Sequence, residues 1–176
     1  MKPSFRPSRA PQSEAHPDSR RFIDSGARIF LGGRYYYRQI GDLAINFCVA
    51  PSLSDEAWRE YLYGSLEVAR ELGRGPSVSM ITFVHAHPNA GQRRFSAHFM
   101  AAERVRPIER VAVLSESDLL RGAMTAFGWL VPTLKYRAFR TSDAAGAFSW
   151  LREIGEFDVE MAVSAWSDAA SKLGPL

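Results

Sequence analysis

Residues 85–94 hold the densest group of side chains able to bind a ligand, and they read His-Ala-His-Pro-Asn-Ala-Gly-Gln-Arg-Arg. An apolar, β-branched run at residues 78–84 precedes them and predicts a central strand. Ligands of α/β sheets bind beyond the carboxyl ends of strands, where the next helix offers unpaired N–H groups and partial positive charge. This pattern predicts a site for an anion or an acidic partner. Its residues are His85, His87, Asn89, Gln92, Arg93 and Arg94.

Arg93 and Arg94 carry most of this prediction. Both are expected in the first turn of a helix that begins near Gln92, where the helix dipole normally favours carboxylates. Two cations there are locally unfavourable, so a bound negative charge would explain them. The alternative left open is that both arginines extend into solvent.

The histidines raise a second question, whether the segment binds zinc. His85 and His87 would share one side of an extended strand, and His98 is expected in the next helix. Three imidazoles can hold zinc in an open site. Pro88 bends the chain directly after His87, however, and no carboxylate lies between His85 and Arg94. We therefore predict no metal site, with these three histidines as weak candidates.

The sequence contains none of the short motifs that organise catalysis or nucleotide binding. There is no G-x-S-x-G elbow, no phosphate-binding G-x-x-x-x-G-K-[ST] loop and no G-x-G-x-x-G. Cys48 is the only cysteine and falls within a predicted strand, where a buried, inert thiol is the usual finding. We predict a protein that is not an enzyme and needs no cofactor.

Charge is unevenly distributed along the 176 residues. Residues 1–21 hold five basic and two acidic side chains, a net of +3, which equals the formal charge of the whole chain. The remainder sums to zero, so we expect no nucleic-acid binding by the folded domain. Within it, residues 93–110 are arginine-rich and residues 152–168 acidic. These are either two solvated faces or complementary patches for docking and self-association.

The first residues differ in composition from the rest. Residues 1–21 include four prolines and few apolar groups, which predicts a disordered basic tail. Neither the apolar stretch of a secretory signal nor a run of about 18 apolar residues is present. With a single cysteine, these features favour a cytoplasmic protein without a membrane span.

Hydrophobic periodicity predicts an α/β fold. Period-two alternation marks an opening three-stranded antiparallel meander, and alternating helices and strands follow. Strands are expected at residues 27–31, 35–39, 43–49, 78–84, 111–114 and 135–139. Helices are expected at residues 54–73, 92–103, 117–131, 142–154 and 158–172. The result is a mixed β-sheet flanked by about five helices. In the last helix the predicted apolar face comprises Val159, Val163, Trp166 and Leu173.

Residues 26–155 resemble the STAS domain, specifically the SpoIIAA-like (anti-sigma-factor-antagonist-like) group. The likeness is carried by residues 35–49 with Gly41-Asp42, by Ser54-Asp55-Glu56, by the strand-to-helix passage 110–117, by residues 136–145 with Phe139-Arg140-Thr141, and by Trp150-Leu151. The resemblance implies a regulatory module that binds a protein partner without catalysis. It also implies a STAS-like domain at residues 22–155, with residues 156–176 as an additional helix packed on or near it.

The chain departs from that family at one functional position. Partner-switching members are phosphorylated on a serine at the start of the helix after a central strand, and residues 84–91 contain no serine. The phosphorylation switch is therefore not carried over.

A rival interpretation is a protein that binds a small molecule or lipid in an apolar pocket between sheet and helices. Aromatic residues make up 12% of the chain, although cores use them too. The residues expected to line such a pocket are Phe47, Phe83, Phe95, Phe99 and Trp129.

Overall fold

The computed structural model describes residues 24–30, 34–49, 54–83, 88–104, 106–119, 121–122 and 135–173. They form a six-stranded sheet in the order β1-β2-β3-β4-β5-β6. The first three strands pair antiparallel and the last three are added in parallel. The strands are β1 (Arg28–Phe30), β2 (Tyr35–Ile40), β3 (Leu43–Cys48), β4 (Val78–Phe83), β5 (Arg110–Leu114) and β6 (Lys135–Phe139). The predicted mixed sheet with an opening meander is confirmed.

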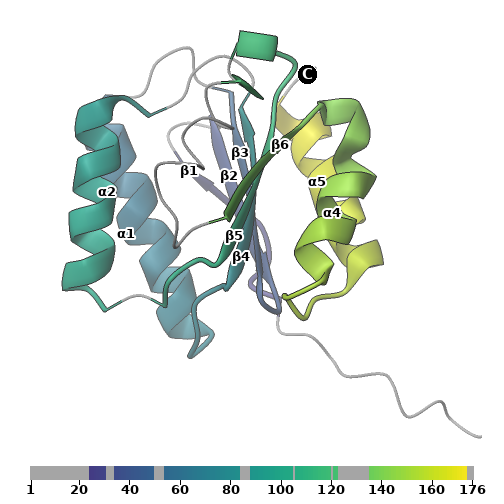
Figure 1. Cartoon of the computed structure of the whole chain (residues 1–176). Coiled ribbons are helices and arrows are strands. Elements are labelled where there is room, and N and C mark those ends of the chain that lie inside the picture. The colour runs from purple at the N-terminus through teal and green to yellow at the C-terminus, as the bar shows by residue number, and fades with distance from the viewer. Residues whose placement is uncertain are drawn as a thin grey trace, which may run out of the picture.

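Helices cover both faces of this sheet. In Figure 1, α1 (Asp55–Glu71) and α2 (Ala90–Ala102) lie on one side, and α4 (Ala144–Arg152) and α5 (Val159–Leu173) on the other. A short 3-10 helix, η1 (Thr141–Asp143), leads into α4. The helix expected at residues 117–131 falls mostly outside the described residues, as does the predicted tail at residues 1–21.

Local signals in the sequence account for where α1 begins and ends. The Ser54 hydroxyl accepts a hydrogen bond from the backbone N–H of Ala57 at 3.1 Å, so it caps the helix as predicted. Gly73, just past the end of the helix, has a φ of 69°, a conformation in which a side chain would be strained. The Gly41–Asp42 turn between β2 and β3 uses a φ of 56° at Gly41 in the same way.

The face of the sheet that α4 and α5 cover is an apolar core. Its fully buried members include Tyr36, Ile45, Phe47, Met80, Leu114, Phe148 and Leu151. Helix α5 belongs to this core, lying over β2 and β3 next to α4. The predicted apolar face of α5 was partly wrong, because Val159 and Val163 are each 41% exposed. The helix instead buries three alanines, whose small side chains allow it to approach the sheet closely: Ala162, Ala165 and Ala169.

The opposite face of the sheet is polar at its centre. Side chains alternate along a strand, so Tyr35 and Tyr37 point toward α1 while Tyr36 points toward α5, as expected. Asn46 on β3 accepts hydrogen bonds from the hydroxyls of Tyr35 (3.1 Å) and Tyr61 (2.9 Å). Its amide nitrogen donates to the Ser79 hydroxyl at 2.9 Å. The amide of Asn46 thus ties β2, β4 and α1 together.

Helix α1 also packs against the edge strand β1. A Cβ atom added at Gly64 would lie 2.4 Å from Cε1 of Phe30, closer than any real contact. The glycine in mid-helix is therefore explained by the ring of Phe30, which rests directly on the backbone of α1.

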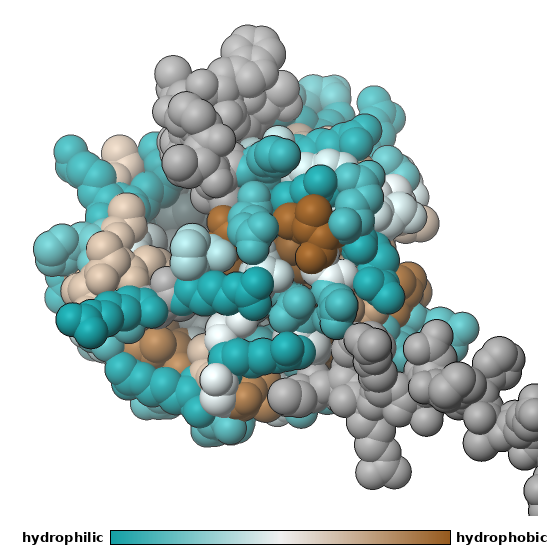
Figure 2. Space-filling view, turned by 60° about the horizontal axis from the view of Figure 1, so that its bottom comes forward, coloured by the Kyte–Doolittle hydropathy of each residue, from teal (hydrophilic) through white to brown (hydrophobic). Residues whose placement is uncertain are grey.

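At the opposite end of the sheet from the start of α2, charge gathers around the Gly41–Asp42 turn. One carboxylate oxygen of Asp42 lies 3.6 Å from Arg74 and 3.7 Å from Arg106. Figure 2 brings this end of the molecule forward, and there hydrophobic residues show only as separate patches among hydrophilic ones.

Candidate partner-binding site

Helix α2 begins with a complete capping box. The Asn89 side chain accepts a hydrogen bond from the backbone N–H of Gln92 at 2.9 Å, and the Gln92 side chain accepts one from the N–H of Asn89 at 3.0 Å. The helix therefore begins at Ala90, two residues before the predicted position. The sequence signal was present, since an asparagine followed three residues later by glutamine is a recognised cap.

Gln92 holds α2 against α1. Its side chain is buried, and its amide nitrogen donates to a carboxylate oxygen of Asp55 at 3.0 Å. The indole N–H of Trp58 donates to the backbone oxygen of Gln92 at 3.2 Å and to the Ser96 hydroxyl at 2.8 Å. Of the residues predicted to bind a partner, Asn89 and Gln92 thus have structural roles, and Gln92 is not accessible.

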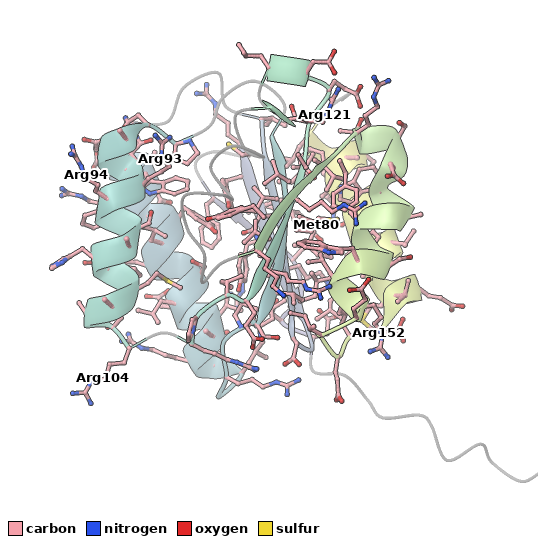
Figure 3. The ribbon with its side chains drawn as sticks, in the orientation of Figure 1. Met80, Arg93, Arg94, Arg104, Arg121 and Arg152 are labelled. Carbon is pink, nitrogen blue, oxygen red and sulfur yellow. The ribbon has the colours of Figure 1, made fainter. Side chains whose placement is uncertain are left out.

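Arg93 and Arg94, treated alike in the sequence, differ in the structure. Figure 3 shows Arg93 directed toward the sheet and Arg94 directed away from it. The guanidinium of Arg93 donates to the backbone oxygen of Pro88 at 2.6 Å. Burial raises the pKa of Tyr136 on β6, and the positive charge of Arg93 opposes that rise. The side chain of Arg94 is exposed and makes no hydrogen bond or ion pair within the described residues, so its charge is available to a partner.

The α1–α2 seam is a ladder of side-chain pairs along two parallel helices. Its ends are polar, with Asp55–Gln92 at one end and Arg70–Glu103, at 2.8 Å, at the other. Its middle is aromatic. The guanidinium of Arg59 lies 4.9 Å from the centre of the Phe95 ring, and the rings of Tyr63 and Phe99 meet edge to face with centroids 4.9 Å apart.

This seam reaches the protein surface. Tyr63 is 51% exposed and Phe95 is partly exposed, whereas Phe99 and Leu62 beneath them are buried. We name the outward part of the seam the α1–α2 surface; it comprises Arg59, Tyr63, Arg94, Phe95 and His98. Arg59 and Tyr63 were not among the residues predicted from the sequence. Their spacing of four residues, next to the apolar positions Trp58 and Leu62, was the available signal.

The histidines do not form a recognisable metal site in the described residues. His85 and His87 lie outside them, and His98 is exposed on α2. Within the part of the chain that the structure describes, no three histidine, cysteine, aspartate or glutamate side chains converge as metal ligands.

The aromatic residues proposed to line an apolar pocket are not brought together. Phe47 faces α5, where its ring centroid lies 6.4 Å from that of Trp166. Phe95 and Phe99 stack with each other in the α1–α2 seam, on the other side of the sheet. Trp129 and the side chain of Phe83 lie outside the described residues. The pairing of Phe47 with the α2 phenylalanines was wrong, because its position on β3 directs it to the opposite face.

A second site, at the ends of β5 and β6, explains the Phe139-Arg140-Thr141 motif. The Glu116 carboxylate accepts hydrogen bonds from the backbone N–H of Thr141, at 3.0 Å, and from its hydroxyl. These bonds lower the pKa of Glu116. The motif therefore fixes the start of the η1–α4 segment to the end of β5, and its role is structural.

A family model described as SpoIIAA-like matches residues 49–152, a span that runs from the end of β3 through α4. No curated protein and no solved structure matches the chain. Among the described helices, none combines the length and apolar character needed to cross a bilayer.

Proposed function

Because this chain belongs to the SpoIIAA-like family, we propose that it is a non-catalytic regulatory module that binds a protein partner through the α1–α2 surface. The partner contacts the exposed ring of Tyr63 and the edge of Phe95, and it places a negative charge against Arg94. No cofactor takes part.

The observation that carries this proposal is the composition of the α1–α2 surface. Tyrosine, arginine and phenylalanine are enriched at protein interfaces, and tyrosine and arginine are among the residues that dominate binding energy. Arg59 and Phe95 already stack on each other, so part of the surface is ordered before a partner arrives. A partner that covers Tyr63 removes a large, half-exposed aromatic ring from water.

Charge on α2 favours an acidic group of the partner, whereas α1 presents the exposed carboxylates of Glu56, Glu60 and Glu67 around Tyr63, which favour a basic one. No acidic residue occurs between Ala90 and Ala102, while Arg93, Arg94 and His98 all belong to this helix. Backbone N–H groups at the start of α2 add partial positive charge. Since residues 84–91 contain no serine to phosphorylate, the site receives a negative charge from the partner and does not acquire its own. The proposal extends to His85 and His87 as flanking contacts.

The proposal is tested by recovering the tagged protein from the organism that makes it, with three variants compared side by side. Tyr63→Ala removes the exposed ring, and Arg94→Glu reverses the available charge. Arg34→Glu is the matched control, because Arg34 is also exposed and its side chain makes no hydrogen bond or ion pair in the described residues. We expect wild type and Arg34→Glu to retain a specific partner at equal levels. Tyr63→Ala and Arg94→Glu should each reduce its recovery at least tenfold, the effect of about 1.4 kcal/mol.

A partner retained equally by all four proteins would place the interface elsewhere. The absence of any partner with the wild type, together with a small molecule retained in its native mass spectrum, would replace the proposal with the ligand-binding alternative.

A further inference from the structure

Two cations stand side by side on β6, the last strand of the sheet. The register pairs Lys135 with Arg110 and Arg137 with Ala112 of β5. Because Phe139 belongs to the core under α4 and side chains alternate along a strand, Lys135 and Arg137 point to that same face of the sheet. Both are exposed. We name this pair the β6 ledge.

The β6 ledge differs from the other cations of the sheet in having no counter-charge. Arg28 on β1 binds Glu71, Arg38 on β2 binds Asp24, and Arg110 on β5 binds Glu153. Within the described residues, neither Lys135 nor Arg137 makes an ion pair or a hydrogen bond through its side chain. The sheet therefore neutralises its strand cations everywhere except on β6.

Neighbouring aromatic rings hold Arg137 in place. Its guanidinium lies 5.1 Å from the centre of the Phe139 ring, which lies 6.1 Å from the ring of Trp150 on α4. The guanidinium of Arg110 lies 5.0 Å from the centre of the Trp150 ring and donates to the Trp150 backbone oxygen at 2.6 Å. A guanidinium stacked in this way loses less rotamer freedom when it binds an anion.

We propose that the β6 ledge is a second interaction site, which binds an extended acidic segment of a partner protein. Same-face residues of a strand are separated by roughly 6.6 Å, twice the rise per residue, in the ledge and in an extended partner alike. Carboxylates on alternate residues of such a segment therefore match Lys135 and Arg137 one to one. The carboxylate over Arg137 accepts both prongs of the guanidinium fork.

Two other occupants fit less well. A second copy of the chain that paired its β6 against this one would set cations opposite cations, which is destabilising. A nucleic acid needs a longer run of positive charge than the two ledge cations supply. A short acidic peptide needs only these two cations, and Glu109 and Glu153 beside them are each paired with an arginine.

This inference is independent of the proposed function, since the β6 ledge lies on the α4 face of the sheet and the α1–α2 surface belongs to the helices of the opposite face (Figure 1). Either proposal can therefore be disproved without affecting the other. In particular, Arg94→Glu leaves the ledge intact, and changes at the ledge leave Arg94 intact.

The test is a titration of the isotopically labelled full chain, followed by amide chemical shifts in low salt. The probe is a synthetic peptide of alternating threonine and glutamate. Its control replaces each glutamate with glutamine, and a second control places the same glutamates in one block. We expect the alternating peptide to shift the amides of β6 and the indole N–H of Trp150, and to bind more tightly than either control.

Variants locate the binding. Lys135→Gln and Arg137→Gln should each weaken it about two- to fivefold, as expected for one exposed ion pair. Arg137→Lys, which keeps the charge and loses the fork, should weaken it less than Arg137→Gln. Both side chains are exposed, so unchanged spectra elsewhere verify the fold. Arg34→Gln, at an exposed arginine outside both surfaces, is the matched control with unchanged affinity.

Three results would overturn the proposal. One is equal binding of the glutamine peptide, and another is equal affinity of Lys135→Gln, Arg137→Gln and wild type. The third is an oligothymidylate that shifts the same amides while the acidic peptide does not, which would make the partner a nucleic acid.

Discussion

The two faces of the sheet are built by different means. Toward α4 and α5 the contacts are mainly apolar, and the helices pack on Phe47, Met80 and Leu114. Few hydrogen bonds cross this face, such as that from the Trp166 indole to the Thr82 hydroxyl at 3.0 Å. Toward α1 the centre of the face holds Asn46 with two tyrosine hydroxyls, so directional hydrogen bonds decide where the helix lies. Buried polar networks of this kind add specificity of position, while apolar packing supplies most of the stability.

This difference bears on the candidate site, because α2 packs chiefly against α1 in the described residues. Figure 1 shows α2 as the outermost helix on its side. The hydrogen bond from Tyr61 to Asn46 fixes α1 on the sheet, and the α1–α2 ladder then fixes α2 on α1. The polar face therefore positions the α1–α2 surface, and the apolar face stabilises the sheet beneath it.

The largest expected difference between the two faces is in stability at alkaline pH, because buried tyrosines lie on the face toward α1. Burial raises the pKa of Tyr35 and of Tyr37, and it raises the pKa of Tyr61 to about 12. Their stabilisation is fully present below pH 10, about where an unfolded tyrosine ionises, and it falls as the pH rises, over pH 10 to 12 for Tyr61. In that window each tyrosine lowers the free energy of unfolding by about 1.4 kcal/mol per pH unit, so the three together lower it by about 4 kcal/mol per pH unit.

The measurement is urea unfolding at a series of pH values above 9, with tyrosinate absorbance recorded in parallel. We expect ionisation of these tyrosines to coincide with loss of secondary structure. The Tyr61→Phe variant should show a shallower decline of stability with pH. If these tyrosines ionised near pH 10, as unburied tyrosines do, while the protein kept its fold, the polar face would be open to water.

A matched pair of truncations compares packing on the two sides. Phe47→Ala removes a ring with no exposed surface and should cost about 3–5 kcal/mol of unfolding free energy. Phe95→Ala removes a partly exposed ring from the α1–α2 seam and should cost about 1 kcal/mol. Urea denaturation at neutral pH measures both. Equal costs would mean that the seam contributes to the core as fully as the face under α5 does.

A further set of variants tests whether the hydrogen bonds of Asn46 act as one network. Asn46→Leu leaves the hydroxyls of Tyr35 and Tyr61 without their acceptor, at a cost of roughly 1 kcal/mol each. Adding Tyr35→Phe and Tyr61→Phe removes the stranded hydroxyls, so the triple variant should recover most of the loss. Unfolding free energies of the full set of combinations give the coupling. Additive costs would show that the hydrogen bonds do not act as a unit.

Much of the fold could be predicted because its signals are local. Ser54 marks the start of α1 and Gly73 its end. The alternation along residues 43–49 predicts which side chains of β3 share a face of the sheet. The error on α5 arose because alanine carries little hydrophobic weight in a periodicity argument. Ala162 and Ala165 nevertheless bury best, since a close helix–sheet approach leaves no room for valine.

The candidate site was predicted only in part. The position of Arg94 near the start of α2 follows from the strand-then-helix pattern, and Arg94 is exposed as the prediction requires. The separation of Arg93 from Arg94 depends on where Pro88 places its carbonyl oxygen, which no sequence pattern encodes. The aromatic pocket failed because it combined residues from both faces of the sheet, and faces are assigned to helices only once strand order and crossover handedness are known.

Just past the end of α2, Arg104 has a φ of 51° and is the only described residue other than glycine with a positive φ. A non-glycine residue in this region costs roughly 1 kcal/mol or more. In the genetic code, every arginine codon becomes a glycine codon by a single base substitution. A more stable form of this protein therefore lies one mutational step away, and random mutagenesis with selection for heat resistance should reach Arg104→Gly early.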